Sequence, residues 1–158
     1  MFQDVVYASL AGDVINEAKT IVEAMDLMNV KRLIWTSSLG IYDEVLREFG
    51  RLNTQALPGY LQVYRKAADL ITSSDLEYTI IRPAWLTDVD EIDYEVTHHN
   101  APFKGTEVSR RSVAAYAVDL INHPRQDVRD SVGVDKPGSD GARPRAAVME
   151  ANGFDPNM

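Results

Sequence analysis

The segment Lys31-Arg-Leu-Ile-Trp-Thr-Ser-Ser38 is apolar through its centre and polar where it ends. An apolar run without polar alternation is typical of a strand that is buried on both faces of a parallel sheet. The runs Asp4-Val-Val-Tyr-Ala8 and Glu77-Tyr-Thr-Ile-Ile-Arg-Pro83 have the same character. Pro83 stops the last run, because proline cannot donate to a strand ladder. The three runs predict three strands.

Helical periodicity lies between these runs. Apolar residues recur at helical spacing over residues 13–29, where Asp13 is the predicted N-cap, and a second helix is expected over residues 60–74. The order is therefore strand, helix, strand, helix, strand. This alternation predicts a Rossmann-like three-layer α/β/α fold around a parallel sheet.

A further helix is expected beyond the third strand. Ser109 should cap it, it should end near Asn122, and its core face should comprise Val113, Ala117, Leu120 and Ile121. A last strand is expected near Val132. Residues 39–59 are interpreted as a loop, and residues 88–104 as irregular. We expect one domain over residues 1–138, followed by an extended or mobile tail over residues 139–158.

Composition narrows the class of protein. The 158 residues are 45% hydrophobic and 25% charged, and no apolar run is long enough to span a membrane. The net charge of −8 and the scattered basic residues argue against a nucleic-acid partner. The absence of cysteine removes thiolate catalysis and disulfides. Without a signal peptide, the expected location is the cytoplasm.

The start of the chain departs from a complete dinucleotide-binding fold. Such a fold opens with a strand, a glycine-rich turn and a helix whose N-terminus holds the pyrophosphate. No such turn precedes the first predicted strand. We therefore expect an N-terminally truncated fold, from a fragment, from a misplaced start codon or from a domain completed by another route. Its unpaired sheet edge predicts self-association or instability.

Four segments carry a family resemblance. They are Asp4-Val-Val-Tyr-Ala-Ser-Leu-Ala-Gly12, Val30-Lys-Arg-Leu-Ile-Trp-Thr-Ser-Ser-Leu-Gly-Ile-Tyr42, Leu76-Glu-Tyr-Thr-Ile-Ile-Arg-Pro-Ala-Trp85 and Val108-Ser-Arg-Arg-Ser-Val-Ala114. In order and spacing they resemble the atypical short-chain dehydrogenases/reductases, in the NmrA-like NAD(P)H-binding branch. The likeness covers residues 4–138.

The resemblance implies three places where a nicotinamide dinucleotide lies. The residues beside the adenosine ribose would be Leu10, Ala11 and Gly12, and the residue at the nicotinamide ribose would be Tyr64. The loop along the nicotinamide would be Pro83, Ala84, Trp85 and Leu86. Two other interpretations stay open. Gly12 also fits a plain chain reversal, and Trp85 also fits a side chain that caps the core.

The resemblance also implies catalytic residues. Ser37 and Ser38 match the family's strand-end serine, which bonds a substrate carbonyl or hydroxyl, and they equally fit serines that satisfy loop backbone groups. Tyr60 matches the tyrosine of the family's Tyr-x-x-x-Lys pair, but Tyr64 stands where the lysine belongs. Lys66 lies about 240° round the helix from Tyr60, so it cannot take the role of the missing lysine. An unassisted tyrosine, with a pKa near 10, is a poor proton donor at neutral pH.

No metal site is predicted. The acidic residues between Asp88 and Glu95 fail the calcium-loop pattern, and they are interpreted as a solvated loop. His98 and His99 have no third ligand at metal spacing, and they are interpreted as loop residues.

The sequence predicts an NAD(P)-binding, oxidoreductase-like protein. The resemblance favours NADP slightly over NAD, with a small-molecule substrate that the sequence leaves unidentified. A module without catalysis, which senses the nucleotide or binds a regulator, is the alternative, and the missing lysine favours it. An inactive truncated form is the third interpretation, and a homo-oligomer is compatible with all three.

Overall fold

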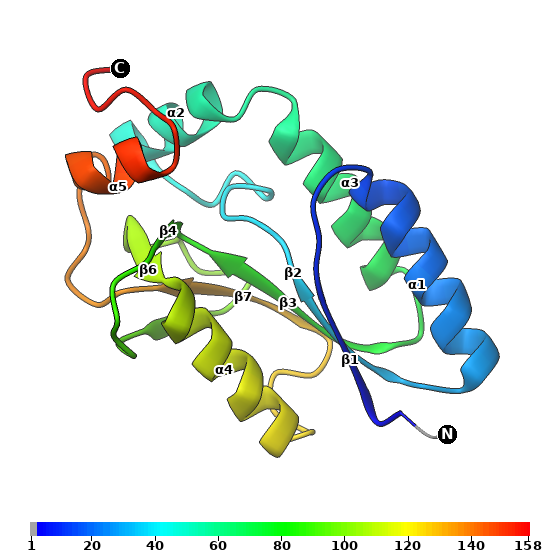
Figure 1. The fold of residues 1–158 in the computed structure, drawn as a ribbon. Helices are drawn as coiled ribbons and strands as arrows, with labels where there is room; N and C mark the ends of the chain where they lie inside the picture. The colour runs from blue at the N-terminus through cyan, green and yellow to red at the C-terminus, as the bar shows by residue number, and fades with distance from the viewer. Residues whose placement is uncertain (1–2) are drawn as a thin grey trace.

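Two sheets organise the chain, for which the computed structural model describes residues 3–158 (Figure 1). The main sheet has five strands in the order β1-β2-β3-β7-β5. Its parallel members are β1 (Val5–Ser9), β2 (Arg32–Thr36), β3 (Glu77–Pro83) and β7 (Asp130–Asp135), and β5 (Glu95–Thr97) is antiparallel. A two-stranded parallel sheet pairs β4 (Trp85–Thr87) with β6 (Glu107–Ser109).

Five helices accompany the sheets. They are α1 (Val14–Met28), α2 (Arg47–Ala56), α3 (Tyr60–Thr72), α4 (Arg110–Asn122) and α5 (Ala146–Ala151). Figure 1 shows α1 and α3 side by side on one side of the main sheet and α4 on the other. The predicted caps are confirmed, since Asp13 accepts from Asn16 N and Ser109 from Ser112 N. None of the helices in this part of the chain has the length and apolarity that crossing a membrane requires.

Burial on both faces explains the apolar strands. In β2, Leu33 and Trp35 belong to the core beneath α1 and α3, whereas Ile34 belongs to the core beneath α4. In β3, Ile80 and Ile81 divide in the same way. Because successive side chains of a strand point to opposite faces, a strand in a sheet covered on both sides favours apolar residues at successive positions rather than at alternate ones. The predicted three-layer fold is confirmed.

The predicted loop over residues 39–59 is wrong, because it contains α2. Its buried residues Phe49, Leu52, Asn53 and Ala56 recur at helical spacing. No side chain caps the helix at Leu46, and charged residues alternate with the apolar ones. Tertiary packing, rather than a strong local signal, therefore stabilises α2.

Three smaller expectations are corrected. The stretch expected to be irregular contains β5, and β5 makes the sheet mixed rather than wholly parallel. The tail expected to be extended contains α5, whose Met149 is fully buried. Ile121 is 44% exposed, because it lies about 80° round α4 from Val113 and so leaves the face that Ala117 and Leu120 share. The strand β5 and the helix α5 were missed because elements of three and six residues are too short to show a periodicity.

A buried ion pair crosses the sheet. Arg82 of β3 is fully buried, and its Nη1 donates to Glu44 Oε2 at 2.5 Å. Its other nitrogens donate to Ser131 of β7, at 2.9 Å to the hydroxyl and 3.1 Å to the carbonyl. The carbonyl of Glu44 accepts from Phe103 N. Arg82 thus joins β3, β7 and the segment that leads into α2.

Glu44→Gln should lower the free energy of unfolding by about 3 kcal/mol, because it leaves the buried guanidinium of Arg82 without its counter-charge. Glu48→Gln is the matched control, since Glu48 pairs with Arg51 in an exposed position and should change stability by about 0.5 kcal/mol at most. Urea unfolding of both variants measures the difference. Equal losses in the two variants would contradict this account.

A second buried carboxyl ends β7. Asp135 is fully buried, and its carboxyl oxygens have no hydrogen-bond partner within residues 3–158. Glu95 of β5 lies directly opposite it in the strand register. Burial, followed by the carboxyl of Glu95, raises the pKa of Asp135 to about 7. The folded protein therefore holds a proton here that the unfolded chain releases at a lower pH.

Stability should fall as pH rises from about 4 to about 7, because the folded state binds more protons than the unfolded state across this window. Asp135→Asn, which is neutral at every pH, should remove that component and raise the melting temperature at pH 8 by at least about 2 °C. Asp75→Asn, at an exposed surface pair, is the control. A difference between Asp135→Asn and wild type that stays constant from pH 4 to pH 8 would refute the assignment.

Candidate functional site

A cavity of about 140 Å³ lies beyond the carboxyl ends of β2 and β3. Ligands of open parallel sheets bind at this end of the strands. Seven of the residues predicted from the sequence line it, namely Ser37, Ser38, Tyr60, Pro83, Ala84, Trp85 and Leu86. The fold therefore brings together side chains from three segments that are distant in sequence.

The two serines differ in their contacts. Ser38 Oγ donates to the carbonyl of Leu39 at 3.2 Å, which is the backbone role that the sequence left open. Ser37 Oγ is buried and has no hydrogen-bond partner within the described residues, although its backbone N–H is bonded to Ile81 O at 2.7 Å. A buried hydroxyl without a partner is unfavourable unless a ligand supplies one. Ser37 is thus the better placed of the two to contact a ligand.

Tyr60 and Tyr64 form a stacked pair at the start of α3, with ring centroids 4.2 Å apart. The hydroxyl of Tyr64 donates to the carbonyl of Leu10 at 2.9 Å. Burial, followed by the neighbouring Tyr64 hydroxyl, raises the pKa of Tyr60 above its ordinary value. Tyr60 is 40% exposed and borders the cavity, but it is a weaker acid than a free tyrosine.

The turn after β1 connects to this pair through Tyr64. Leu10, Ala11 and Gly12 are exposed, and Gly12 has a φ of 95°, a conformation that favours glycine. This conformation fits the chain reversal that the sequence suggested for Gly12. Asp13 caps the following helix with its own carboxylate, which accepts from Asn16 N and Asn16 Nδ2. That carboxylate occupies the anion-attracting end of α1.

Neither basic residue of α3 reaches Tyr60. Lys66 is exposed, and it borders a surface depression with Ile15 and Leu70. Arg65 pairs with Asp69, and its Nη1 donates to the carbonyl of Ile41. The helical geometry predicted this result for Lys66. In the described structure, no lysine takes the place that the family pattern requires beside Tyr60.

Trp85 has a structural contact and also borders the cavity. Its ring is 6% exposed, and Nε1 donates to Asn53 Oδ1 at 3.0 Å. Phe154 lies against it with ring centroids 5.0 Å apart. Both interpretations of Trp85 from the sequence therefore agree with its position.

Five residues of the site were missed in the sequence, among them Leu39 and Leu57, which line the cavity. Asn53 holds Trp85 from α2, which was taken for a loop. Asn152 and Phe154 line the cavity from the tail, and Asn152 Nδ2 donates to the carbonyl of Leu86 at 3.0 Å. The spacing of Phe49, Leu52, Asn53 and Ala56 was the available signal for α2. No pattern in the sequence pointed to the tail.

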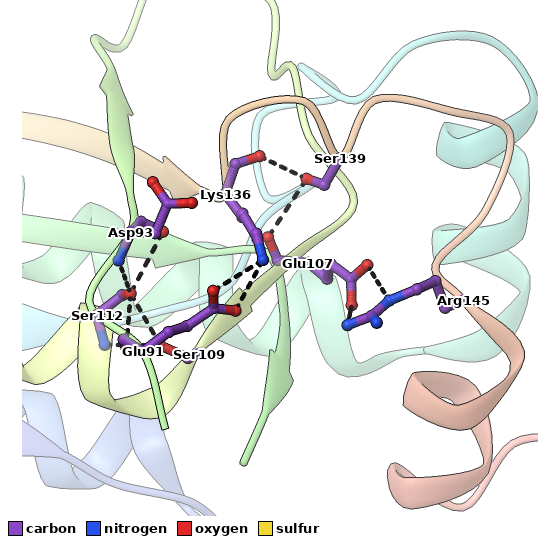
Figure 2. Close-up of polar contacts among 8 residues, drawn as sticks. All are labelled: Glu91, Asp93, Glu107, Ser109, Ser112, Lys136, Ser139 and Arg145. Carbon is purple, nitrogen blue, oxygen red and sulfur yellow. Dashed lines mark hydrogen bonds and ion pairs between the residues drawn. The ribbon is translucent and has the colours of Figure 1, made fainter. Parts of the chain in front are cut away.

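A polar network, drawn in Figure 2, attaches the chain that leads into α5 to β6. Glu107 of β6 is buried, and both of its carboxylate oxygens accept from Arg145, at 2.8 and 3.0 Å. Ser139 Oγ bonds the carbonyls of Glu107 and Lys136. Lys136 Nζ donates to both carboxylate oxygens of Glu91. The network thus connects the acidic segment after β4, the strand β6 and the chain before α5.

Ser109 and Ser112 extend this hydrogen-bond network into α4. The Ser109 hydroxyl donates to the carbonyl of Glu91 at 2.7 Å, and Ser112 Oγ accepts from Asp93 N at 2.9 Å (Figure 2). Two arginines at the start of α4 pair with Asp88 and Asp90 in exposed positions. The acidic segment is therefore a partly paired loop rather than a wholly solvated one.

Arg145→Ala should loosen α5 and the chain after it, because Glu107 then keeps a buried charge without a partner. Hydrogen exchange of residues 146–154 should accelerate by at least about tenfold, the equivalent of about 1.4 kcal/mol. Arg125→Ala, at an exposed site before β7, should leave this exchange unchanged. Unaltered protection of α5 in Arg145→Ala would mean that the ion pair does not hold the helix.

Comparisons with known proteins agree with this geometry. A sequence model of the NAD(P)H-binding family matches residues 2–124. The chain is similar to a Rossmann-fold NAD(P)-binding family protein from Shigella flexneri, with 46% identity and a TM-score of 0.75. It is also similar to a short-chain dehydrogenase/reductase (wide type) from Veillonella parvula in complex with NADP, with 30% identity and a TM-score of 0.84. Proteins with curated functions gave no match.

Both structural alignments cover 90% of this chain. They cover 64% of the Shigella protein and 67% of the Veillonella protein. The chain thus spans about two thirds of the length of these relatives.

Proposed function

Because the chain belongs to the NAD(P)H-binding family of atypical short-chain dehydrogenases/reductases, we propose that it binds a nicotinamide dinucleotide at the carboxyl ends of β2 and β3. One observation carries the proposal. The predicted serines, the predicted tyrosine and residues 83–86 line a single cavity, and the unpartnered hydroxyl of Ser37 is buried beside it. NADP is the preferred form by resemblance, and the NADP complex of the Veillonella relative supports that choice.

The residues present fit one half of such a cofactor. Trp85 and Pro83 offer an apolar surface beside Ser37, as a nicotinamide ring requires. The N-terminus of α1 does not fit the pyrophosphate half, because the Asp13 carboxylate already occupies this helix end. We therefore propose that residues 3–158 supply the nicotinamide side of the site.

The protein residues around that half suggest a carbonyl reduction. A bound reduced nicotinamide supplies a hydride to a small-molecule substrate. Ser37 Oγ would donate a hydrogen bond to the substrate oxygen, and Tyr60 would supply the proton. The raised pKa of Tyr60 opposes this proton transfer, because no neighbouring lysine stabilises its phenolate. We infer slow turnover.

A second function follows from the same tyrosine pair. Tyr64 occupies the lysine position, and its hydroxyl donates to the carbonyl of Leu10, which holds the turn after β1. Tyr60 remains a weak acid. Such an arrangement suits nucleotide recognition without turnover. A sensor of nucleotide redox state, or a module that binds a regulator, is therefore the alternative proposal. The edge strand β1 offers backbone groups for self-association in either case.

Calorimetric titration should give saturable binding of NADPH, and weaker binding of NADH. Ser37→Val should weaken NADPH binding by at least about tenfold, because the added methyl groups fill the cavity and the hydroxyl is lost. Ser73→Val, at the exposed C-terminus of α3, is the matched control. A folded chain that binds neither nucleotide would overturn the proposed function.

The same protein should reduce a carbonyl substrate slowly with NADPH if it is an enzyme. Tyr60→Phe should then abolish turnover and leave the NADPH dissociation constant unchanged, because only the proton donor is removed. Nucleotide binding without turnover of any aldehyde or ketone in a substrate panel would support the sensor. Turnover that survives in Tyr60→Phe would exclude the assigned role of Tyr60.

A further inference from the structure

Three potential metal ligands converge at the other end of the sheet, where β7 begins. They are His98, which follows β5, Asp130, which opens β7, and Asp127, from the loop before β7. One ligand atom from each residue lies within 4.8 Å of the other two. No third ligand for His98 was predicted from the sequence, because Asp127 lies 29 positions further along the chain. Antiparallel pairing of β5 with β7 supplies the missing carboxylates.

Neighbouring groups hold the two carboxylates in place. The hydroxyl of Tyr116, a residue only 1% exposed, donates to Asp127 Oδ2 at 2.6 Å. Ser131 N donates to Asp130 Oδ1 at 2.7 Å. Each carboxylate therefore keeps one oxygen for another partner, and Asp130 Oδ2 now contacts His98 Nδ1 at 2.7 Å. Hydrogen-bonded outer partners of this kind orient the ligands of protein metal sites.

The negative charge of this cluster lacks a fixed counter-ion. Within residues 3–158, Asp127 makes no ion pair within 4.0 Å, and Asp130 pairs with His98 alone. The nearby Arg32 directs its Nη2 at Thr79 Oγ1 and the carbonyl of Gln126. A cation bound here would neutralise the charge of the two carboxylates.

We propose that His98, Asp127 and Asp130 bind one divalent transition-metal ion, for which Zn²⁺ is the best match. One imidazole nitrogen and two carboxylate oxygens suit Zn²⁺ or a similar ion, whereas Mg²⁺ and Ca²⁺ prefer oxygen ligands alone. The ion would replace the proton between His98 and Asp130, and water would complete its coordination. This site is independent of the proposed nucleotide function.

The ion would hold the edge strand β5 against β7. β5 has three residues and pairs with β7 alone, so its attachment is short. A metal that joins His98 to Asp127 and Asp130 would fix the chain just after β5 to the start of β7. Binding to the folded state alone raises stability in proportion to the logarithm of free metal concentration.

The chain contains a matched histidine for the test. His123 lies 3.1 Å from Asp119 through the same type of nitrogen-to-carboxylate contact and is 63% exposed, close to the 62% of His98. It has no third ligand in the described structure. His123→Ala therefore removes an equivalent surface pair without touching the cluster.

The experiment is a calorimetric titration of the untagged full chain with ZnCl₂ at pH 7.5, where ligand imidazoles are deprotonated. Wild type and His123→Ala should bind one equivalent, and the melting temperature of both should rise with Zn²⁺. His98→Ala and Asp127→Asn should each weaken binding by at least about tenfold. Asparagine tolerates the φ of 51° at position 127, so the second variant keeps the loop. MgCl₂ should give no comparable heat.

Two results would overturn the site. Absence of saturable Zn²⁺ binding by folded wild type would leave only a surface ion pair between His98 and Asp130. Zn²⁺ binding that His98→Ala and Asp127→Asn leave unchanged would place the metal elsewhere on the chain. Neither result would bear on nucleotide binding, which is measured separately.

Discussion

The buried pair of Arg82 with Glu44 is the constraint on which the arrangement of the sheet depends. A guanidinium inside a sheet needs a counter-charge and acceptors for its N–H groups, and Glu44 and Ser131 supply them. These contacts join β3 to β7 and hold the segment after β2 against the sheet. That segment leads into α2, which carries Asn53. Asn53 in turn accepts from Trp85 at the cavity. The pairing of Arg82 with Glu44 therefore contributes to the position of Trp85.

Burial of the sheet on both sides determines where a ligand can bind. Helices α1 and α3 cover one face and α4 covers the other, so the central strands β2, β3 and β7 are buried along their faces. Their ends remain open to a ligand. The polar residues Ser37 and Ser38 follow β2 at that end, where their side chains do not have to enter an apolar core. Fold and site thus arise from the same pattern, in which strand centres are apolar and strand ends are polar.

The sequence predicted most of the central fold and less of its periphery. Apart from α2, the strands and helices up to Pro83 follow from apolar runs and from apolar residues at helical spacing, because burial imposes a strong pattern on them. The helix α2 was missed since its polar residues masked a buried face of four residues, and α5 has too few residues to show any face. Ser37, Tyr60 and Trp85 were predicted through resemblance. Asn152 and Phe154 reach the cavity from the tail through contacts with Leu86 and Trp85, which no local pattern in the sequence reveals.

Tyr64 shows how one substitution can support structure and limit chemistry at once. A lysine at this position would stabilise the phenolate of Tyr60, but it would need room for its charge beside the cavity. Tyr64 instead packs its ring on Tyr60 and donates its hydroxyl to the carbonyl of Leu10. The turn after β1 is thereby tied to α3 by a neutral hydrogen bond, while Tyr60 stays protonated. The geometry keeps a donor that can bond a ligand oxygen and makes its proton hard to transfer, and for that reason recognition is better supported here than catalysis.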